Sequence, residues 1–586
     1  MFLVTTANQK YWKTDEKILF LGEWCKMYRE KHIWSNLDHE TLPPHWDKYQ
    51  QLNSHRTYLE EIFEKYLKVF ASNLNNCHNE DHSLRYWRII IGPWLKMFID
   101  VVYDRYLSIK STIDYAVTNT WIPNLNPALW VPVGSTAFHW GCMSSHNFNL
   151  YLYARLIKKL GKISFEFKDD ELFFDPLYIP ELKALALSDN LKNNKRDLVS
   201  KLLKLIPDRF HKIVFCSTGL SFGNNLKLIF SLGQAPFMSP CIAPCRTPIK
   251  ENLRKNLKVP EETDEFESIL NDLVAEQLPI SFFEGYLAMR SKSLKAYPKA
   301  TKAIFTSNKM TTAPDEAFRF WVADRVEKGA KLILTQHGGG YGLFSSFSEK
   351  HELEICDKFF SWGWGGEQPK VSPMTSTKLQ SSRYNIRSDP GGTILLVTAS
   401  SPLFDVRFDH VAGGGLGLNR FLQVKRFLNF VCPEAYKLLL ARLLSFDYGW
   451  NEKKRLADIC PSLQVYEGEA SMTEQLRRSR LCIHNYFGTT WLETLSMNFP
   501  TVVFWDSNMV HTLASVQPYL DDLRRLKILH DTPESAAEFV NEIYEDPLAW
   551  WMSLETQQVK DKFCYLFART SKNWLKEWKE ELLKNG

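Results

Sequence analysis

Small and hydroxyl-bearing residues stand where an apolar segment gives way to a helix-like segment in HNYFGTTWLETLSMNFPTVVFWD, residues 484–506. Backbone N–H groups at Gly488, Thr489 and Thr490 would lie at a helix start, where the helix dipole and unpaired donors favour an anion such as phosphate. Glu493 lies one turn further on and can accept a hydrogen bond from a ribose or sugar hydroxyl. In the alternative interpretation, Thr489 is only the N-cap of the helix.

Two other strand ends in the same half of the chain carry polar groups. Arg442 lies within the apolar stretch KLLLARLL, and its planar fork of donors suits phosphate oxygens, although an ion pair with Asp447 explains it equally well. In TASSPLFD, Ser400 and Ser401 offer hydroxyl and amide groups to a diphosphate or a sugar. The alternative for the two serines is a simple turn cap.

The stretch TQHGGGYG closes an apolar segment in the first half of the chain. Three consecutive glycines are entropically costly, which favours a cleft lining over a plain connector. His337 could donate to a donor phosphate or take a proton, while Gly338 and Gly339 would let a ligand approach the backbone. A buried histidine within a flexible loop is the alternative.

Two carboxylates, Asp315 and Glu316, begin the helix-like segment in TTAPDEAFRFW. Glycosyl transfer needs a base for the acceptor hydroxyl or, in retaining chemistry, a nucleophile, and either residue could serve. Acidic residues at a helix start are also ordinary caps, so this alternative stays open.

Short apolar segments alternating with helical ones must position these groups, a pattern typical of parallel sheets covered on both faces. Ligands of such sheets bind at the carboxyl ends of the strands, where all of the residues above are expected. Strands are predicted in the first half at 2–7, 18–24, 212–219, 302–308, 331–342 and 358–365, with a helical region over 55–113. Strands are predicted in the second half at 393–400, 437–444, 463–468, 481–486, 501–506 and 527–531.

The chain of 586 residues is too long for one hydrophobic core, and a polar stretch rich in Ser, Pro and Gly interrupts it. We predict an α/β protein with two Rossmann-like domains facing across a cleft. The N-terminal acceptor-side domain, with a helical insertion, would span 1–375, a linker 376–392, and the C-terminal donor domain 393–545. Helices over 546–586 would cross back to the N-terminal domain.

Composition excludes several classes of protein. The net charge of +5, spread along the chain, argues against nucleic-acid binding but suits an anionic donor or surface. The start has no signal-peptide pattern, and charges interrupt the apolar stretch 83–109, which predicts a core helix. Eleven cysteines without paired spacing indicate reduced thiols, and the pair Cys241 and Cys245 has no second pair to complete a metal site.

Other catalytic motifs are missing from the sequence. No Walker A pattern, HExxH pattern or zinc-finger spacing occurs, and the glycine-rich stretches do not follow the first strand of a βαβ unit with an acidic partner. These observations disfavour an NTPase, a dehydrogenase and a zinc enzyme. The segment GGGLG (413–417) follows no strong strand and is predicted to be a loop.

Taken together, several segments resemble a bacterial family of transferases of surface-carbohydrate or O-antigen biosynthesis, over nearly the whole chain. They are FLVTTA, FLGEWC, DHSLRYWRIIIGPWL, TQHGGGYG, DYGW, GTTWLETLSMNFPTVVFWD and TPESAAEFVNEIYED. The resemblance implies a GT-B glycosyltransferase that needs no metal or other cofactor. The chain also looks like capsule enzymes that use CMP-activated acidic sugars of the sialic, pseudaminic or Kdo type.

In those capsule enzymes a basic residue and a hydroxyl pair hold the nucleotide phosphate, and Arg442 with Thr489–Thr490 occupy similar kinds of position. The His-Pro pair of some of these enzymes is absent at Arg442, so His337 is the candidate for a compensating phosphate or catalytic ligand.

The predicted activity is sugar transfer from a nucleotide-sugar donor to a glycan, a lipid-linked glycan or a protein such as flagellin. The expected location is the cytoplasm, including the periphery of the inner membrane if the acceptor is lipid-linked. Two alternatives remain: a nucleotide-sugar epimerase or hydrolase built from two Rossmann units, and a non-catalytic scaffold for polysaccharide assembly.

Overall fold

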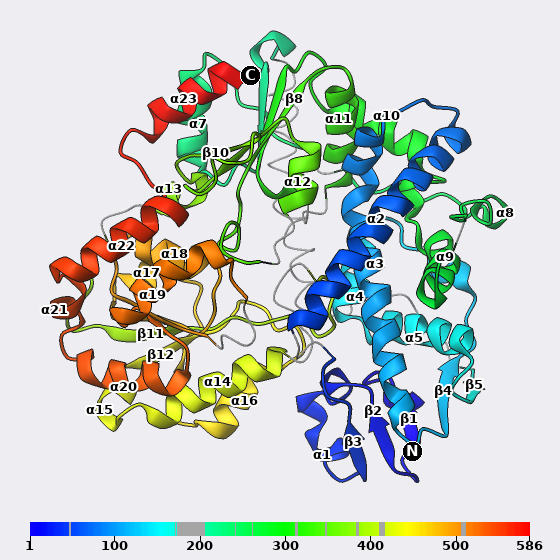
Figure 1. Cartoon of the computed structure of the whole chain (residues 1–586), viewed down its shortest axis with the longest axis horizontal. Helices are drawn as coiled ribbons and strands as arrows, with labels where there is room; N and C mark the ends of the chain where they lie inside the picture. The colour runs from blue at the N-terminus through cyan, green and yellow to red at the C-terminus, as the bar shows by residue number, and fades with distance from the viewer. Residues whose placement is uncertain are drawn as a thin grey trace.

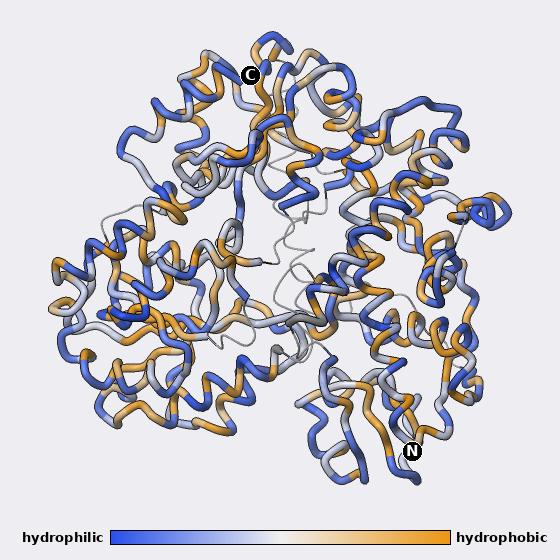
Figure 2. The backbone as a smooth tube through the Cα atoms, viewed as in Figure 1, coloured by the Kyte–Doolittle hydropathy of each residue, from blue (hydrophilic) through white to orange (hydrophobic). Residues whose placement is uncertain are grey.

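Three parallel β-sheets, each covered by helices, make up the protein (Figure 1). The computed structural model describes residues 1–45, 49–169, 172, 206–240, 242–260, 262–310, 315–345, 349–382, 386–408, 416–505 and 511–585. All pairings between the strands of these sheets are parallel, which confirms the predicted α/β class. The strands are largely apolar, whereas the helices show polar and apolar residues in alternation (Figure 2).

The first sheet has the order β3-β2-β1-β4-β5. Its central strands β1 and β2 consist entirely of buried apolar residues, as expected for strands covered on both faces. The strands are β1 (Phe2–Val4), β2 (Ile18–Phe20), β3 (His39–Thr41), β4 (Asn119–Pro123) and β5 (Phe165–Lys168).

Two long helices, α2 (Tyr49–His78) and α3 (Leu84–Lys110), connect β3 to β4. The Ser83 hydroxyl caps α3 by accepting a hydrogen bond from the Tyr86 N–H (3.2 Å). Helix α3 is buried among α2, α5 (His146–Leu160) and α11 (Glu316–Glu327), so the predicted core helix is confirmed. Over the described ranges, no helix has the length and apolar character needed to cross a bilayer.

The middle sheet has the order β10-β9-β8-β7-β6. One face packs against α11, which contacts α3 in turn, and the other is covered by α7 (Phe222–Ser231) and by α23 (Trp574–Asn585) near the C-terminus. The Trp578 ring of α23 lies 5.1 Å from the rings of both Phe305 and Phe360. The strands are β6 (Ile213–Cys216), β7 (Ala303–Thr306), β8 (Lys331–Thr335), β9 (Lys358–Ser361) and β10 (Val371–Pro373).

The third sheet has the order β13-β12-β11-β14-β15-β16, the doubly wound arrangement in which the strand order reverses between β11 and β14. All six strands predicted for this half are present, although β13 and β16 have only two residues each. The strands are β11 (Thr393–Val397), β12 (Leu439–Arg442), β13 (Gln464–Val465), β14 (Ser479–His484), β15 (Thr501–Phe504) and β16 (Leu529–His530).

The number of sheets differs from the sequence-based expectation. Residues 1–375 were expected to hold one Rossmann-like sheet, but they hold two separate five-stranded sheets. Strand β1 pairs with β4 across the whole α2–α3 hairpin, and no strand of the first sheet pairs with a described strand of the middle one. Pairing between such distant segments leaves no local signal in the sequence.

The chain passes between the middle and third sheets twice, and the two passages lie side by side. The first contains α13 (Thr377–Ser382), and the second follows α22 (Leu554–Phe567). The Ser376 N–H donates to the Arg569 carbonyl (2.8 Å), and the Ser571 N–H donates to Gln380 Oε1 (3.0 Å). The predicted linker is therefore structured in part and is tied to the C-terminal helices.

Candidate active site

The carboxyl ends of β11 and β14 flank the point where the strand order of the third sheet reverses, the usual ligand position in doubly wound folds. Ser400 and Ser401 follow β11. The Ser401 hydroxyl is buried and accepts a hydrogen bond from Arg420 Nη1 (2.6 Å). The Ser400 hydroxyl is also buried and lies beside the Glu452 carboxylate.

Helix α18 (Thr489–Ser496) begins directly after β14 and lacks a side-chain cap. Gly488 occupies the N-cap position, and a Cβ there would lie 2.3 Å from the Tyr486 ring, so a side chain would not fit. The Thr490 hydroxyl is hydrogen-bonded to the Tyr486 hydroxyl. Thr489 is therefore not the N-cap that the alternative interpretation expected, and the first N–H groups of the helix have no side-chain acceptor in the described chain.

The glycine run of the middle sheet meets this helix start. The Gly339 N–H donates to Thr489 Oγ1 (3.1 Å), and a Cβ on Gly339 would lie 2.5 Å from the Gly488 carbonyl oxygen. Gly338 has more room, because a Cβ there would meet nothing closer than 3.9 Å. The turns that follow β8 and β14, here called the β8 and β14 turns, are 150 residues apart in sequence and form one junction between two sheets.

Each sheet together with its covering helices is called a unit below. A second contact between the middle and third units lies just beyond the glycine run. Phe344 forms an antiparallel bridge with Thr512, and the Leu513 N–H donates to the Leu343 carbonyl (2.9 Å). Leu343 and Phe344 belong to the same hydrophobic cluster as Trp491 of α18. The β8 loop is therefore packed into the third unit.

His337 stands beside this junction and is linked to a buried carboxylate. The Tyr341 hydroxyl lies 3.0 Å from His337 Nδ1 and donates a hydrogen bond to Glu352. Glu352 is fully buried, and its Oε1 lies 3.8 Å from His337 Nδ1. A carboxylate and a phenol on one side of the imidazole fix its orientation, as required of a group that moves a proton.

Arg442 points away from this junction. Its Nη1 donates to the Ala470 carbonyl (3.0 Å) and to the Gln475 side chain, and its guanidinium lies over the Tyr466 ring. Asp447 instead accepts from the Gly449 N–H (2.7 Å). The structure thus gives Arg442 neither an anion-facing position nor the ion pair with Asp447 that the sequence suggested.

Asp315 and Glu316 are both engaged in structural contacts. Asp315 caps α11 by accepting from the Phe318 N–H (3.0 Å), and it forms an ion pair with Lys309. Glu316 is buried and accepts from the Ser135 N–H at the start of a helix of the first unit. The contact of Asp315 matches the capping alternative, whereas Glu316 binds the start of another helix, α4 (Ser135–Ser144).

Glu493 lies one turn into α18 and faces the middle unit. Its carboxylate is 3.7 Å from Lys378 Nζ, and burial raises its pKa, an effect that Lys378 opposes. Glu493 therefore adds a further polar contact, between α18 and α13 in the first passage between the two sheets.

Two residues that the sequence did not reveal complete the edge of the third sheet. Arg420 comes from α14 (Leu416–Phe430), and Glu452 begins α16 (Glu452–Ile459). Burial raises the pKa of Glu452 to about 7, with the Ser400 hydroxyl and Arg420 opposing the rise. Neither residue follows a strand directly, so inspection of strand ends could not find them.

The arrangement can bind an anion and move a proton. Unpaired N–H groups of α18 and the guanidinium of Arg420 supply positive potential at the switch point. Glu452, whose pKa burial raises to about 7, can exchange a proton near neutral pH, and the imidazole of His337 is a candidate proton acceptor. Across the described residues, no group of three or more His, Cys, Asp or Glu side chains has the arrangement of a metal site.

Comparisons with known proteins agree with a transferase. The sequence profile of a family described as "LIC12162 family transferase" matches residues 1–582. A search of curated proteins found no match.

Two solved structures were also found by similarity. A MurG of Acinetobacter baumannii shares 13% identity, with 64% of this chain and 98% of that chain covered and a TM-score of 0.28. WaaG, a glycosyltransferase involved in lipopolysaccharide biosynthesis, shares 12% identity, with 64% and 100% covered and a TM-score of 0.27.

Proposed function

We propose, from the premise that this chain belongs to the LIC12162 family of transferases, that it is a glycosyltransferase of the GT-B type. It would transfer a sugar from a nucleotide-sugar donor to a glycan, a lipid-linked glycan or a protein. The reaction would take place in the cytoplasm, and at the membrane periphery when the acceptor is lipid-linked.

The observation that carries this proposal is the uncapped start of α18 at the switch point of the third sheet. A donor phosphate there would accept hydrogen bonds from the N–H groups at Thr489 and Thr490, and Arg420 lies at the neighbouring strand end. These groups would stabilise the negative charge that develops on the leaving phosphate. We propose that this charge is met by the protein's own donors, so that no metal or other cofactor is required.

His337 would serve the acceptor from the other side of the junction. The acceptor oxygen attacks the anomeric carbon while the bond between that carbon and the phosphate oxygen breaks. The nucleotide leaves with the bonding electron pair, and the acceptor's proton passes to His337. Glu352 and Tyr341 would orient the imidazole and stabilise its charged form. This role replaces the base role that the sequence suggested for Asp315 or Glu316.

For the donor we propose a CMP-activated acidic sugar of the nonulosonic or Kdo type. The support is the resemblance to capsule enzymes and the mild positive charge of the chain. A thermal-shift screen with CMP, UDP, GDP and dTDP sugars tests this, because a bound donor raises the melting temperature with concentration. A shift with another nucleotide alone contradicts the CMP assignment, and no shift with any contradicts glycosyl transfer.

The double variant Thr489→Ala/Thr490→Ala tests the phosphate site by calorimetry. The backbone N–H groups stay in this variant, but the Thr489 hydroxyl, which accepts from the Gly339 N–H, loses the proton that it could donate to the phosphate. Donor binding should weaken about tenfold or more, since a hydrogen bond to a charged group is worth about 1.5–3 kcal/mol. The control is Thr532→Ala, which removes a threonine cap from α20 (Pro533–Ile543) and should leave donor affinity unchanged. Unchanged affinity in the double variant would refute a phosphate role for the two hydroxyls. Product analysis without acceptor distinguishes an epimerase from a glycosyltransferase, because only the epimerase needs no acceptor. A non-catalytic scaffold would release no nucleotide from any donor.

A further inference from the structure

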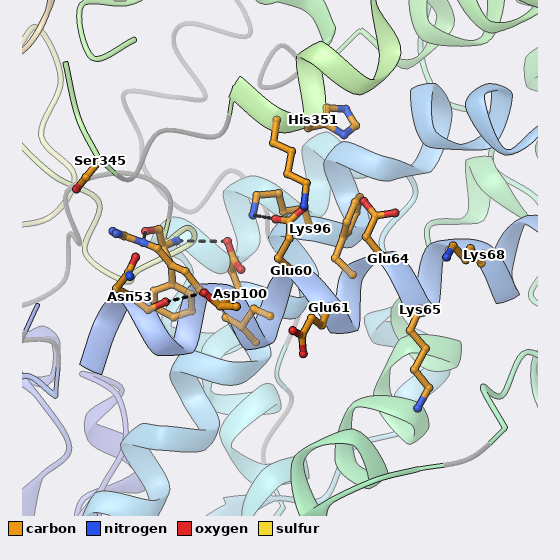
Figure 3. Close-up of a pocket in the computed structure, with 16 residues that line it drawn as sticks. Asn53, Glu60, Glu61, Glu64, Lys65, Lys68, Lys96, Asp100, Ser345 and His351 are labelled. Atoms are coloured by element: carbon orange, nitrogen blue, oxygen red, sulfur yellow. Dashed lines mark hydrogen bonds and ion pairs between the residues drawn. The ribbon is translucent and has the colours of Figure 1, made fainter. Parts of the chain in front are cut away.

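A cavity of about 700 Å³ lies along α2, outside the donor site. Helix α2 forms its floor, α3 and α12 (Glu349–Ile355) contribute further side chains, and Ser345 approaches from the β8 loop (Figure 3). Its size falls within the range of about 300–1,000 Å³ typical of small-molecule sites. None of the residues assigned above to sugar transfer lines this cavity.

The lining of the cavity is highly charged, and its charges differ in how firmly they are held. Arg88 neutralises Glu64 through two hydrogen bonds of 2.7 and 2.5 Å. Glu60 lies between Lys350 (3.1 Å) and Lys96 (3.9 Å), so two cations share one carboxylate. Ion pairs between partly exposed side chains contribute little stability and can be exchanged for a ligand at small cost.

Lys68 adds a further cation at the same wall. Its side chain is exposed and takes part in no ion pair or hydrogen bond within the described part of the chain. With Lys96 and Lys350 it gives the cavity three ammonium groups, two of which share the Glu60 carboxylate. Ammonium groups bind carboxylates and donate to hydroxyls, whereas a carboxylate accepts from hydroxyls, so a sugar acid satisfies both.

Two loops of the donor site run directly to this cavity. Ser345 lies six residues after Gly339, which touches the α18 start, and Phe408 lies seven residues after Ser401. Six residues span at most roughly 20 Å and seven at most roughly 25 Å. The β8 loop is shorter than that limit, because the Phe344 N–H bonds back to the Gly340 carbonyl (2.9 Å).

From these observations we infer that the α2 cavity binds the acceptor, and that the acceptor is an oligosaccharide carrying an acidic group. The identification of the bound oligosaccharide as the acceptor rests on the proposed function. The binding of an acidic oligosaccharide at this cavity stands on the cavity's own charges and can be tested alone.

The test measures retention of the full chain on an array of neutral and acidic oligosaccharides of two to six sugars. The variant is Lys68→Met/Lys350→Met, which changes two exposed side chains. The matched control is Lys255→Met/Lys258→Met, in a separate cavity of about 400 Å³. Lys258 is 57% exposed and 3.2 Å from Asp272, closely matching Lys350, which is 58% exposed and 3.1 Å from Glu60.

We expect the wild type and the control to retain acidic oligosaccharides, and the cavity variant to lose affinity for them about tenfold or more. The melting-temperature shift with donor should stay the same in all three proteins. Retention of acidic oligosaccharides by the variant, or their failure to bind the wild type, overturns the inference. A lost donor shift in the cavity variant overturns the acceptor assignment, whereas failure of the wild type to bind any donor counts against the proposed function instead.

Discussion

Replacing Gly339 by alanine tests whether the β8 and β14 turns must touch. The added Cβ would lie 2.5 Å from the Gly488 carbonyl oxygen, 2.9 Å from its carbon and 3.1 Å from Leu492 Cδ1. Comfortable contacts between such atoms are about 3.5 Å or more, so the turns must separate by about 1 Å. The first two atoms belong to the backbone and cannot rotate away.

The magnitude follows from two terms. Overpacking of this kind costs about 1–3 kcal/mol. Separation by about 1 Å also breaks the 3.1 Å hydrogen bond from Gly339 to Thr489, which contributes about 0.5–1.5 kcal/mol. At about 2–4 °C per kcal/mol for units of this size, the melting temperature should fall by about 10 °C. Donor affinity should fall with it, since the phosphate site adjoins the junction.

Gly338→Ala is the matched control, because its Cβ would meet nothing nearer than 3.9 Å and neither glycine has a positive φ. Its stability should be unchanged or higher by about 0.4–1 kcal/mol. Thermal denaturation and donor calorimetry on both variants decide the matter. Equal behaviour of the two alanine variants would refute the claim that close contact of the turns holds the site together.

Three further substitutions separate the roles assigned above. Burial raises the pKa of Glu452 from 4.5 to about 7, so the folded chain keeps a proton that the unfolded chain loses, and stability should fall as pH rises through this interval. Glu452→Gln should flatten that fall in denaturation measured from about pH 5 to pH 8; an unaltered profile contradicts the raised pKa. Arg442→Met should lower the unfolding free energy by about 1–3 kcal/mol and leave donor affinity unchanged in calorimetry, because its partners are Ala470 and Gln475; weakened donor binding would restore the phosphate role. Glu352→Gln should lower kcat about 10–100-fold without changing donor Kd, since His337 loses its orienting carboxylate, and an unchanged kcat argues against that positioning role.

The sequence predicted the strands of the third sheet well because each is a short apolar run between clear breaks. The reversal at β11 and β14 could not be predicted, since it depends on which strands pair rather than on where they lie. The same limitation applies to the first 375 residues, where β3, β4, β5 and β10 were not recognised and two sheets were taken for one. Strand pairing across a long helical hairpin has no local pattern.

The site was predictable where backbone geometry decides it and not where side-chain direction does. Glycines at 338–339 and 488 were expected to let a ligand approach the backbone, and in the structure Gly339 instead lies against Gly488. Arg442 lies at a strand end as expected, but the neighbouring Ala470 carbonyl and Gln475 draw its guanidinium aside. Arg420 enters from a helix, where nothing in the local sequence separates it from an ordinary surface arginine.

The position of α23 has a consequence for how the protein folds during its synthesis. One face of the middle sheet is closed by Trp578 and Leu582, although its last strand ends at Pro373. A ribosome adds about 5–20 residues per second, so roughly 10–40 s pass before those two side chains exist. During that interval Phe305 and Phe360 lack their final covering, and the nascent chain presents an apolar surface on which chaperones can act.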